Sequence, residues 1–256
     1  MTNKNNHDSE IIDQFTKQAI PFTKVSGHLD SMELLIEFSK LSASDTVLDV
    51  ACGPGMVTCE FANKCSHITG IDLTPAMIEQ AKQRQQETAL NNITWDIGNA
   101  TPLPYDDNTF SLVITRYSFH HFIQPDSALD EMIRVCKPGG RVLVADVGIN
   151  PNKSNAYDTL EIMRDPSHVH ALSTTEFDQL FQTPKLEKCI KTAYGVDIEL
   201  EAQLKASFPK DVDEQKLREM VTNDIGTNNL DINARRKGKS IIYTVPIVVY
   251  VGVKSV

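Results

Sequence analysis

The chain of 256 residues lacks a long apolar run. The longest, Ile241 to Val253, is interrupted by Thr244, Pro246 and Gly252 and is shorter than the roughly 20 apolar residues that a membrane-spanning helix needs. Residues 1–13 are rich in Asn and charge and have neither the apolar segment of a signal peptide nor the Arg-rich pattern of a transit peptide. We therefore expect no membrane span and a cytoplasmic protein.

Paired cysteines and an excess of basic residues are also missing. The five cysteines include no C-x-x-C pair, and their odd number suits free thiols better than disulfides or a zinc site, so no metal is expected. The 25 Lys and Arg are outnumbered by 34 Asp and Glu, and the net charge of −9 argues against a nucleic-acid partner. We expect a small neutral or cationic ligand, and the sequence leaves the oligomeric state open.

Length and composition indicate one globular domain. Hydrophobic residues make up 41% and charged residues 23%, which is typical of soluble folded chains, and the length fits a single elaborated domain. The negative charge is concentrated in residues 1–150, with a net charge of −8 against −1 for residues 151–256. A cationic ligand should therefore bind to the first half.

Short β-branched runs alternate with helical patterns in that half, which predicts βαβ units around a parallel sheet. The expected strands are 47–50, 67–71, 93–97, 111–115 and 141–147, and the expected helices are 55–64, 75–89 and 125–136. The helix at 75–89 has Thr74 as its N-cap and Pro75 at its first position.

The second half departs from this alternation. A polar segment reaches about Leu172, and the spacing of Ser173 and Glu176 predicts a capping box that begins a helix. A strand over 186–200 with a bend near Gly195, an exposed helix over 211–224 and a final strand over 240–254 follow. Pro246 indicates an irregularity or an edge in that strand, and the basic run 235–239 before it is interpreted as a solvated hairpin.

The first residues that point to function follow the first strand. The small-residue turn from Ala51 to Gly55 leads into a helix and would let the backbone approach a ligand closely. Thr58 stands where a dinucleotide fingerprint would have its third glycine, which disfavours NAD and FAD. Asp72 lies 17 positions after Gly55, at the end of the second strand, where its carboxylate can accept hydrogen bonds from both hydroxyls of a ribose.

Five motifs in order carry a family resemblance: D-x-A-C-G-P-G, G-I-D-L-T-P-A-M, N-A-T-P-L-P, H-H-F and C-K-P-G-G-R-V. Over roughly residues 45–150 the chain resembles the class I S-adenosylmethionine-dependent methyltransferases, in particular the small-molecule branch called methyltransferase type 11, with the ubiquinone and menaquinone methyltransferases.

The resemblance implies an α/β, Rossmann-like fold. Its mostly parallel sheet would have seven strands in the order 3-2-1-4-5-7-6, with strand 7 antiparallel and helices on both faces. It also implies a single domain in four parts: a helical cap over 1–30, a cofactor-binding core over 45–150, a substrate-side elaboration over 151–240 and the final strand over 240–254.

Carried over residue by residue, the resemblance assigns S-adenosylmethionine contacts to ten positions. The methionine end would contact Asp49, Ala51, Cys52, Gly53 and Gly55, the ribose Asp72, and the adenine Leu73, Met77, Asn99 and Ala100. Arg116, at the end of the fourth strand, is a further candidate for cofactor binding because of its guanidinium group. The chain departs from the family at Ala51, where glycine is common and the change should cost little, and at Asn99, where aspartate is common.

Each of these residues also has a structural explanation. Gly53 and Gly55 could form an ordinary turn, Asp72 could precede and cap the helix at 75–89, and Met77 could be a core residue. Arg116 could hold either the cofactor carboxylate or a substrate oxygen, or form a surface salt bridge.

The chemistry itself asks little of the protein, because the cofactor carries the methyl group and the protein supplies positioning and, where needed, a base. The candidates for the base are His120 and His121, which follow Tyr117 after the fourth strand, where the substrate should lie. The alternative is that these histidines bond to loop carbonyls.

Two segments resemble covers over the site in this branch. One is the loop 164–170, with Arg164 and His168, and the other is an N-terminal helix that includes Phe15 and reaches toward Phe22. A solvated loop and simple amphipathic packing explain the two segments equally well.

The sequence therefore predicts S-adenosylmethionine-dependent methyl transfer to carbon, oxygen or nitrogen of a small metabolite. One alternative is a protein that keeps the fold and binds the cofactor but transfers no methyl group. A second is a nucleotide-binding or interaction module with no affinity for this cofactor.

Overall fold

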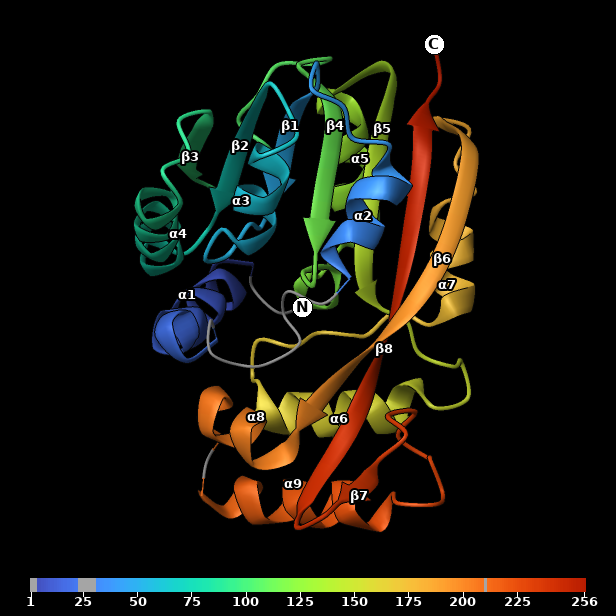
Figure 1. The fold of residues 1–256 in the computed structure, drawn as a ribbon. Helices are drawn as coiled ribbons and strands as arrows, with labels where there is room; N and C mark the ends of the chain where they lie inside the picture. The colour runs from blue at the N-terminus through green and yellow to red at the C-terminus, as the bar shows by residue number, and fades with distance from the viewer. Residues whose placement is uncertain (1–3, 23–30, 210) are drawn as a thin grey trace.

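A computed structural model of the chain describes residues 4–22, 31–209 and 211–256. Its central sheet has the strand order β3-β2-β1-β4-β5-β8-β6, with β7 paired to one end of β8 (Figure 1). The strands are β1 (Thr46–Val50), β2 (His67–Asp72), β3 (Ile93–Ile97), β4 (Phe110–Arg116), β5 (Cys136–Val147), β6 (Leu186–Glu199), β7 (Arg235–Lys237) and β8 (Ser240–Lys254).

The topology expected from the sequence is confirmed. Strands β1 to β5 pair in parallel, and β8 inserts antiparallel between β5 and β6. The one addition is β7, a three-residue strand that forms a hairpin with β8 and makes the sheet eight-stranded. Arg236 and Lys237 on β7 are exposed, in agreement with a solvated basic hairpin.

Helices cover both faces of the sheet because successive strand residues point to opposite sides. On β1, Val47 packs into one apolar cluster and Leu48 into the other. The first cluster includes α2 (Met32–Ser39) and α3 (Met56–Ala62), and the second includes α5 (Pro125–Val135) and α7 (Thr174–Leu180). Three further helical elements lie around the sheet. Helix α4 (Pro75–Thr88) packs against β2 and β3, and α1 (Lys4–Phe22) packs against α4. A short 3-10 helix, η1 (Phe119–His121), follows β4.

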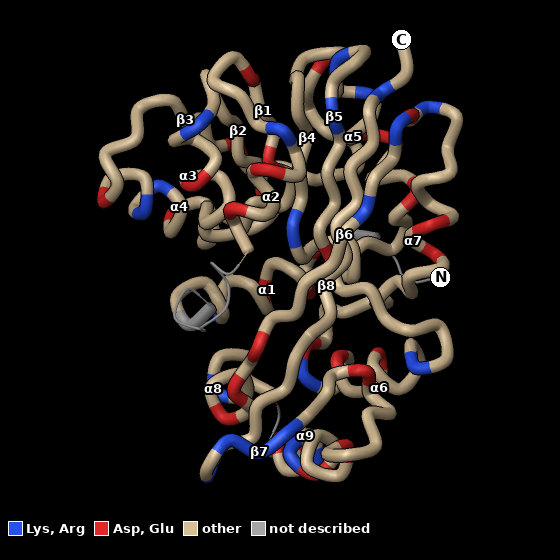
Figure 2. The backbone as a smooth tube through the Cα atoms, turned by 45° about the vertical axis from the view of Figure 1, so that its right-hand side comes forward, with Lys and Arg blue, Asp and Glu red and all other residues tan. Residues whose placement is uncertain are grey.

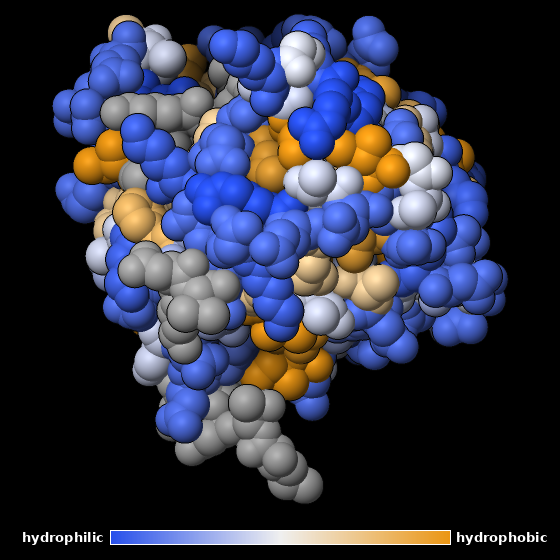
Figure 3. Space-filling view, turned by 90° about the horizontal axis from the view of Figure 1, so that it is seen from below, coloured by the Kyte–Doolittle hydropathy of each residue, from blue (hydrophilic) through white to orange (hydrophobic). Residues whose placement is uncertain are grey.

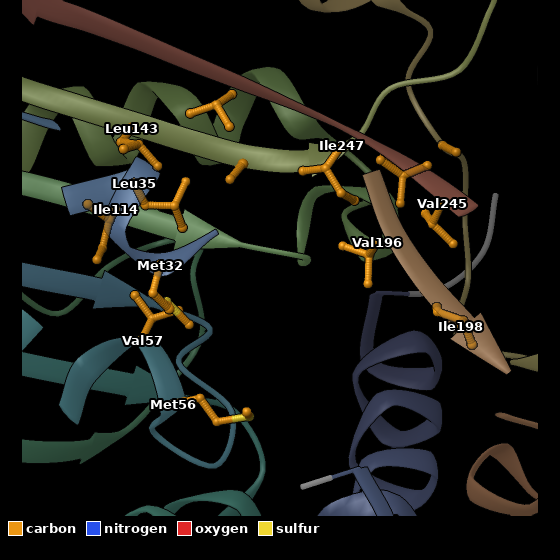
Figure 4. Packing of buried hydrophobic residues seen from close by; sticks show 14 of the residues in the cluster. Met32, Leu35, Met56, Val57, Ile114, Leu143, Val196, Ile198, Val245 and Ile247 are labelled. Carbon is orange, nitrogen blue, oxygen red and sulfur yellow. The ribbon is translucent and has the colours of Figure 1, made fainter. Parts of the chain in front are cut away.

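Strands β6 and β8 are long enough to continue past the sheet into a lower lobe (Figure 1). The lobe contains α6 (Ser154–Arg164), α8 (Leu200–Ser207) and α9 (Asp211–Asn223); α8 packs against both strands, and α6 packs against α9. The first apolar cluster extends along these strands into the lobe. Figure 4 shows two of its members, Val196 on β6 and Val245 on β8, at a distance from two others, Leu35 and Ile114, at the main sheet. One apolar core therefore joins the lobe to the sheet.

Several details of the second half differ from expectation. The polar segment 151–172 contains α6, and α9 is half-buried because Leu217 and Val221 pack into the core. Pro246 lies inside the sheet opposite Gly195, at the point where pairing with β5 ends. Helices α2 and α8 were not predicted, whereas the capping box of Ser173 and Glu176 is confirmed at the start of α7.

The surface carries both signs of charge. Figure 2 shows acidic and basic residues interspersed along the backbone, and the face seen from below is largely hydrophilic with scattered apolar patches (Figure 3). Within the described ranges no helix is long and apolar enough to cross a membrane, and no group of three or more His, Cys, Asp or Glu could hold a metal ion. All five cysteines are free thiols.

Candidate active site

A cavity of about 310 Å³ lies where β1, β2 and β4 end. This is the position at which the strand order reverses, and open α/β sheets bind ligands at such a position. Its walls come from the turn after β1, the end of β2, the segments after β3 and β4, and α1, which lies beneath this edge of the sheet (Figure 1). The predicted residues that line it are Phe15, Ala51, Cys52, Gly53, Asp72, Leu73, Met77, Asn99, Ala100, Arg116, Tyr117 and His121.

The turn after β1 is left-handed at three of its five residues. The φ angles of Ala51, Gly53 and Gly55 are 54°, 53° and 73°. A Cβ atom at Gly53 would meet nothing within 4 Å, so this backbone is open to a ligand, whereas one at Gly55 would come within 2.6 Å of the Trp95 ring. Gly55 is thus required for packing and does not line the cavity. At Ala51 a residue with a Cβ is strained at this φ by roughly 1 kcal/mol, a strain that glycine would not have.

Asp72 holds this turn in place. One carboxylate oxygen accepts a hydrogen bond from the Gly53 N–H at 2.8 Å and the other accepts one from the Thr74 N–H at 2.8 Å. Burial raises the pKa of Asp72, and the two backbone hydrogen bonds oppose that rise. Because an ionised carboxylate has about four acceptor positions, Asp72 can shape the turn and still accept hydrogen bonds from a ligand in the cavity.

Asp49 lies behind the cavity wall. Its side chain is buried, and its Oδ2 accepts a hydrogen bond from the Thr58 hydroxyl at 2.6 Å. Burial raises its pKa to about 7, with the negative charge of Asp72 adding to the rise and Arg116 opposing it. The structure therefore does not bring Asp49 into contact with the cavity, which differs from the contact that the resemblance implied.

Part of the cavity wall is apolar and lies next to an amide side chain. Leu73 and the buried Met77 line the cavity beside Asn99 and Ala100. The Asn99 Nδ2 donates to an Asp8 carboxylate oxygen at 3.0 Å, and its Oδ1 accepts from the Thr101 N–H at 3.0 Å. An amide oxygen has two acceptor positions, so one remains on Asn99.

Arg116 and Tyr117 form one corner of the cavity. The guanidinium lies 4.2 Å from the centre of the Tyr117 ring and donates hydrogen bonds to the hydroxyls of Tyr117, at 2.7 Å, and Tyr194, at 3.2 Å. Arg116 is largely buried, so it does not lie on the surface of the protein.

The two neighbouring histidines lie in different environments. His120 does not line the cavity: its Nδ1 is 2.6 Å from the buried carboxylate of Asp146. Burial lowers the pKa of His120, but the charge and hydrogen bond of Asp146 outweigh this and raise it above the usual value. His121 lines the cavity, and burial together with the neighbouring charge of His120 lowers its pKa strongly.

Of the two segments expected to cover the site, the N-terminal helix reaches the cavity and the loop 164–170 does not. On α1, Phe15 lines the cavity and packs edge-on against His121, with ring centres 5.1 Å apart, whereas the Phe22 side chain lies outside the described residues. Arg164 and His168 do not reach the cavity. Arg164 pairs with the buried Glu161, and the buried His168 bonds to Asp158 at 2.7 Å.

Sequence reasoning missed the other cavity residues of α1. His7, Asp8 and Ile11 recur on one side of the helix and line the cavity together with Phe15. His7 Nε2 lies 2.7 Å from the carbonyl oxygen of His121, which ties α1 to the turn after β4. Their three- and four-residue spacing is a helical signal, but nothing local indicates which surface this face covers.

Comparison with known proteins places the chain in a family. Residues 41–223 match the family model described as "Methyltransferase domain". The chain belongs to the S-adenosylmethionine-dependent methyltransferases. Its resemblance to this family, first indicated by five short motifs, is therefore confirmed.

Several relatives agree with this assignment. The methyltransferase is 27% identical to the uncharacterized methyltransferase YcgJ of Bacillus subtilis over 90% of this chain and 93% of that one. The crystal structure of YcgJ superimposes with a TM-score of 0.81, at 24% identity, over 90% of this chain and all of YcgJ. The ubiquinone/menaquinone biosynthesis C-methyltransferase UbiE of Roseobacter denitrificans is 32% identical, over 49% of this chain and about half (52%) of its own length. A geranyl diphosphate C-methyltransferase of Streptomyces coelicolor, solved in complex with S-adenosyl-L-homocysteine, shares the fold, with a TM-score of 0.60 and 16% identity over 88% and 75% of the chains.

The cavity residues fit the family's cofactor. Asp8 and Asp72 supply negative charge for a sulfonium cation, Leu73 and Met77 offer an apolar surface for a purine ring, and the turn at Gly53 is open. The cavity volume of about 310 Å³ is at the lower end of the range of roughly 300–1,000 Å³ that is typical of small-molecule sites.

Proposed function

We propose that this methyltransferase transfers the methyl group of S-adenosylmethionine to carbon, oxygen or nitrogen of a small metabolite bound in the cavity beside Tyr117 and His121. The observation that carries the proposal is that one continuous cavity joins the Gly53 turn and Asp72 to an aromatic corner after β4. One half suits the cofactor and the other suits an acceptor molecule.

The residues divide the work of binding. Asp72 would accept hydrogen bonds from the ribose, Leu73 and Met77 would pack on the adenine, and Asn99 would read its edge. The backbone of Ala51 and Gly53 and the Arg116 guanidinium would hold the methionine end, whose carboxylate suits the guanidinium fork. Asp49 would not touch the cofactor and would act indirectly, by supporting the turn at residues 51–55.

When bound, S-adenosylmethionine supplies a methyl group on a sulfonium cation. The contribution of the chain is to orient the acceptor and to exclude water. Phe15, Tyr117 and Phe122 line the acceptor side with aromatic surface, and α1 closes that side of the cavity. These features support an acceptor with a substantial apolar surface.

The test is product formation with the full chain. The protein is incubated with S-adenosylmethionine and a panel of phenols, amines and C–H acids, and S-adenosylhomocysteine is measured by mass spectrometry against a reaction without acceptor. At a subsaturating concentration of S-adenosylmethionine, Asp72→Ala should lower the signal severalfold, because the variant binds the cofactor more weakly. Glu79→Ala, which removes an exposed carboxylate of α4, should leave it unchanged.

Two other results would contradict the proposal. Cofactor binding by calorimetry without turnover on any acceptor would favour a protein that keeps the fold but transfers no methyl group. No binding at all would favour an interaction module. The cytoplasmic location and the lack of a nucleic-acid partner, both expected from the sequence, stay predictions.

A further inference from the structure

The protonation of His121 can be worked out from its neighbours. Its Nδ1 lies 3.0 Å from the carbonyl oxygen of Ser167 and 3.2 Å from the hydroxyl oxygen of the same residue. A carbonyl oxygen only accepts hydrogen bonds, so the first contact requires a proton on Nδ1.

The second contact leads to the same conclusion. The Ser167 hydroxyl lies 2.6 Å from Asp165 Oδ1, and an ionised carboxylate can only accept. The hydroxyl proton is therefore given to Asp165, which leaves the Ser167 oxygen as an acceptor toward His121. Asp165 is itself buried and also accepts a hydrogen bond from the Ser167 N–H at 2.9 Å. This second hydrogen bond holds Asp165 in the position at which it accepts the Ser167 hydroxyl proton.

A proton on Nδ1 leaves Nε2 as the open position of the ring. Burial and the nearby charge of His120 lower the pKa of His121, so the ring is neutral and Nε2 carries a lone pair. Within the part of the chain that the structure describes, no group donates a hydrogen bond to Nε2. The His121 ring lines the cavity with Phe15, and because the buried Ser167 engages Nδ1, Nε2 is the ring nitrogen that remains for a bound molecule.

Building on the proposed function, we propose that His121 selects the acceptor: its unprotonated Nε2 accepts a hydrogen bond from a hydroxyl or N–H group of an otherwise apolar substrate. The hydrogen bond orients the acceptor molecule, and the donor keeps its proton. Asp165 and Ser167 are positioning residues, since they act by fixing the tautomer of His121.

This assigns different roles to the adjacent histidines. His120 donates to Asp146 and favours the charged form, whereas His121 donates to a carbonyl oxygen and stays neutral. The positive charge of His120, whose ring centre is 4.2 Å from that of His121, further disfavours a second proton. An acceptor that lacks a donor would leave the Nε2 lone pair buried and unpaired, which costs about 1–3 kcal/mol.

The tautomer can be measured without knowing the substrate. Ring ¹⁵N NMR spectra of the labelled full chain, with His121 assigned by its loss in His121→Asn, should show the Nδ1–H form at pH 7 and no titration of this ring down to pH 5. The groups that face it are His120, His168, Asp165 and, through the His121 carbonyl, His7. An Nε2–H form, or titration of this ring above pH 5, would overturn the inference.

Phenol and anisole then test recognition, since they share a ring and differ in the donor. Phenol at millimolar concentration should shift the Nε2 resonance, and anisole should not. His121→Asn retains a donor toward Ser167 but lacks the outer acceptor, so phenol should bind about tenfold more weakly. His121→Gln, which places an amide oxygen farther out, should bind phenol more tightly than the Asn variant.

Equal binding of phenol and anisole, or equal losses in the two variants, would show that His121 acts only through its shape. Cofactor binding and product formation are measured separately, so a wrong tautomer in an active enzyme refutes this inference alone. A correct tautomer in a protein that does not bind S-adenosylmethionine refutes the proposed function instead.

Discussion

The buried carboxyl of Asp49 should make the stability of this protein depend on pH in an unusual direction. Asp49 is only 1% exposed, and burial raises its pKa from 3.8 to about 7. The folded protein therefore binds this proton more tightly than the unfolded chain does. The contribution of Asp49 to stability is greatest below pH 4, decreases as the pH rises toward 7, and is constant above that.

The magnitude follows from the size of the shift. Each pKa unit corresponds to about 1.4 kcal/mol, so a shift of this size makes folding less favourable by roughly 2–3 kcal/mol at pH 8 than at pH 5. In Asp49→Asn the amide oxygen can still accept the hydrogen bond from the Thr58 hydroxyl, and no charge is buried. We expect the variant to gain stability relative to the parent by about 2 kcal/mol over this pH range.

Urea unfolding of both proteins without cofactor, at pH 5, 6, 7 and 8, measures the difference. Glu79→Gln, which neutralises an exposed carboxylate on α4, is the matched control and should show no trend beyond a few tenths of a kcal/mol. If the difference between Asp49→Asn and the parent is the same at every pH, the Asp49 pKa is not raised and the reasoning fails.

Three further predictions concern the site. Asp72→Ala should weaken S-adenosylmethionine binding at least tenfold by calorimetry, because it removes acceptors for the ribose and also frees the Gly53 N–H; unchanged affinity would place the ribose elsewhere. Ala51→Gly should raise the free energy of unfolding by about 0.5–1 kcal/mol in the same urea assay, since glycine is unstrained at a φ of 54°, and a decrease would contradict this account. Amides of α1 around residues 7–15 should gain protection from hydrogen exchange when S-adenosylhomocysteine is added, whereas the packed segment 164–170 should not change; equal exchange in α1 would make it plain surface structure.

The sequence by itself determined the elements whose signals are local. Short β-branched runs and helical patterns located the five strands and most of the helices between residues 45 and 150, and the small residues after Val50 identified the turn at which the backbone approaches a ligand. The position of Asp72 at the end of a strand was enough to place it beside that turn, because parallel strands end at the same edge of a sheet. In the second half the polar segment hid α6, whose apolar face shows only against the lobe built on β6 and β8.

Only the tertiary structure decided what the individual side chains face. Asp49 and Asp72 both stand near strand ends, yet one contacts Thr58 behind the wall and the other lines the cavity. His120 and His121 are adjacent in sequence, but their protonation depends on Asp146 and Ser167, which are 26 and 46 residues away. The physical reason is that burial and hydrogen-bond partners set a pKa or a tautomer, and those partners are brought together by long-range packing that no local pattern encodes.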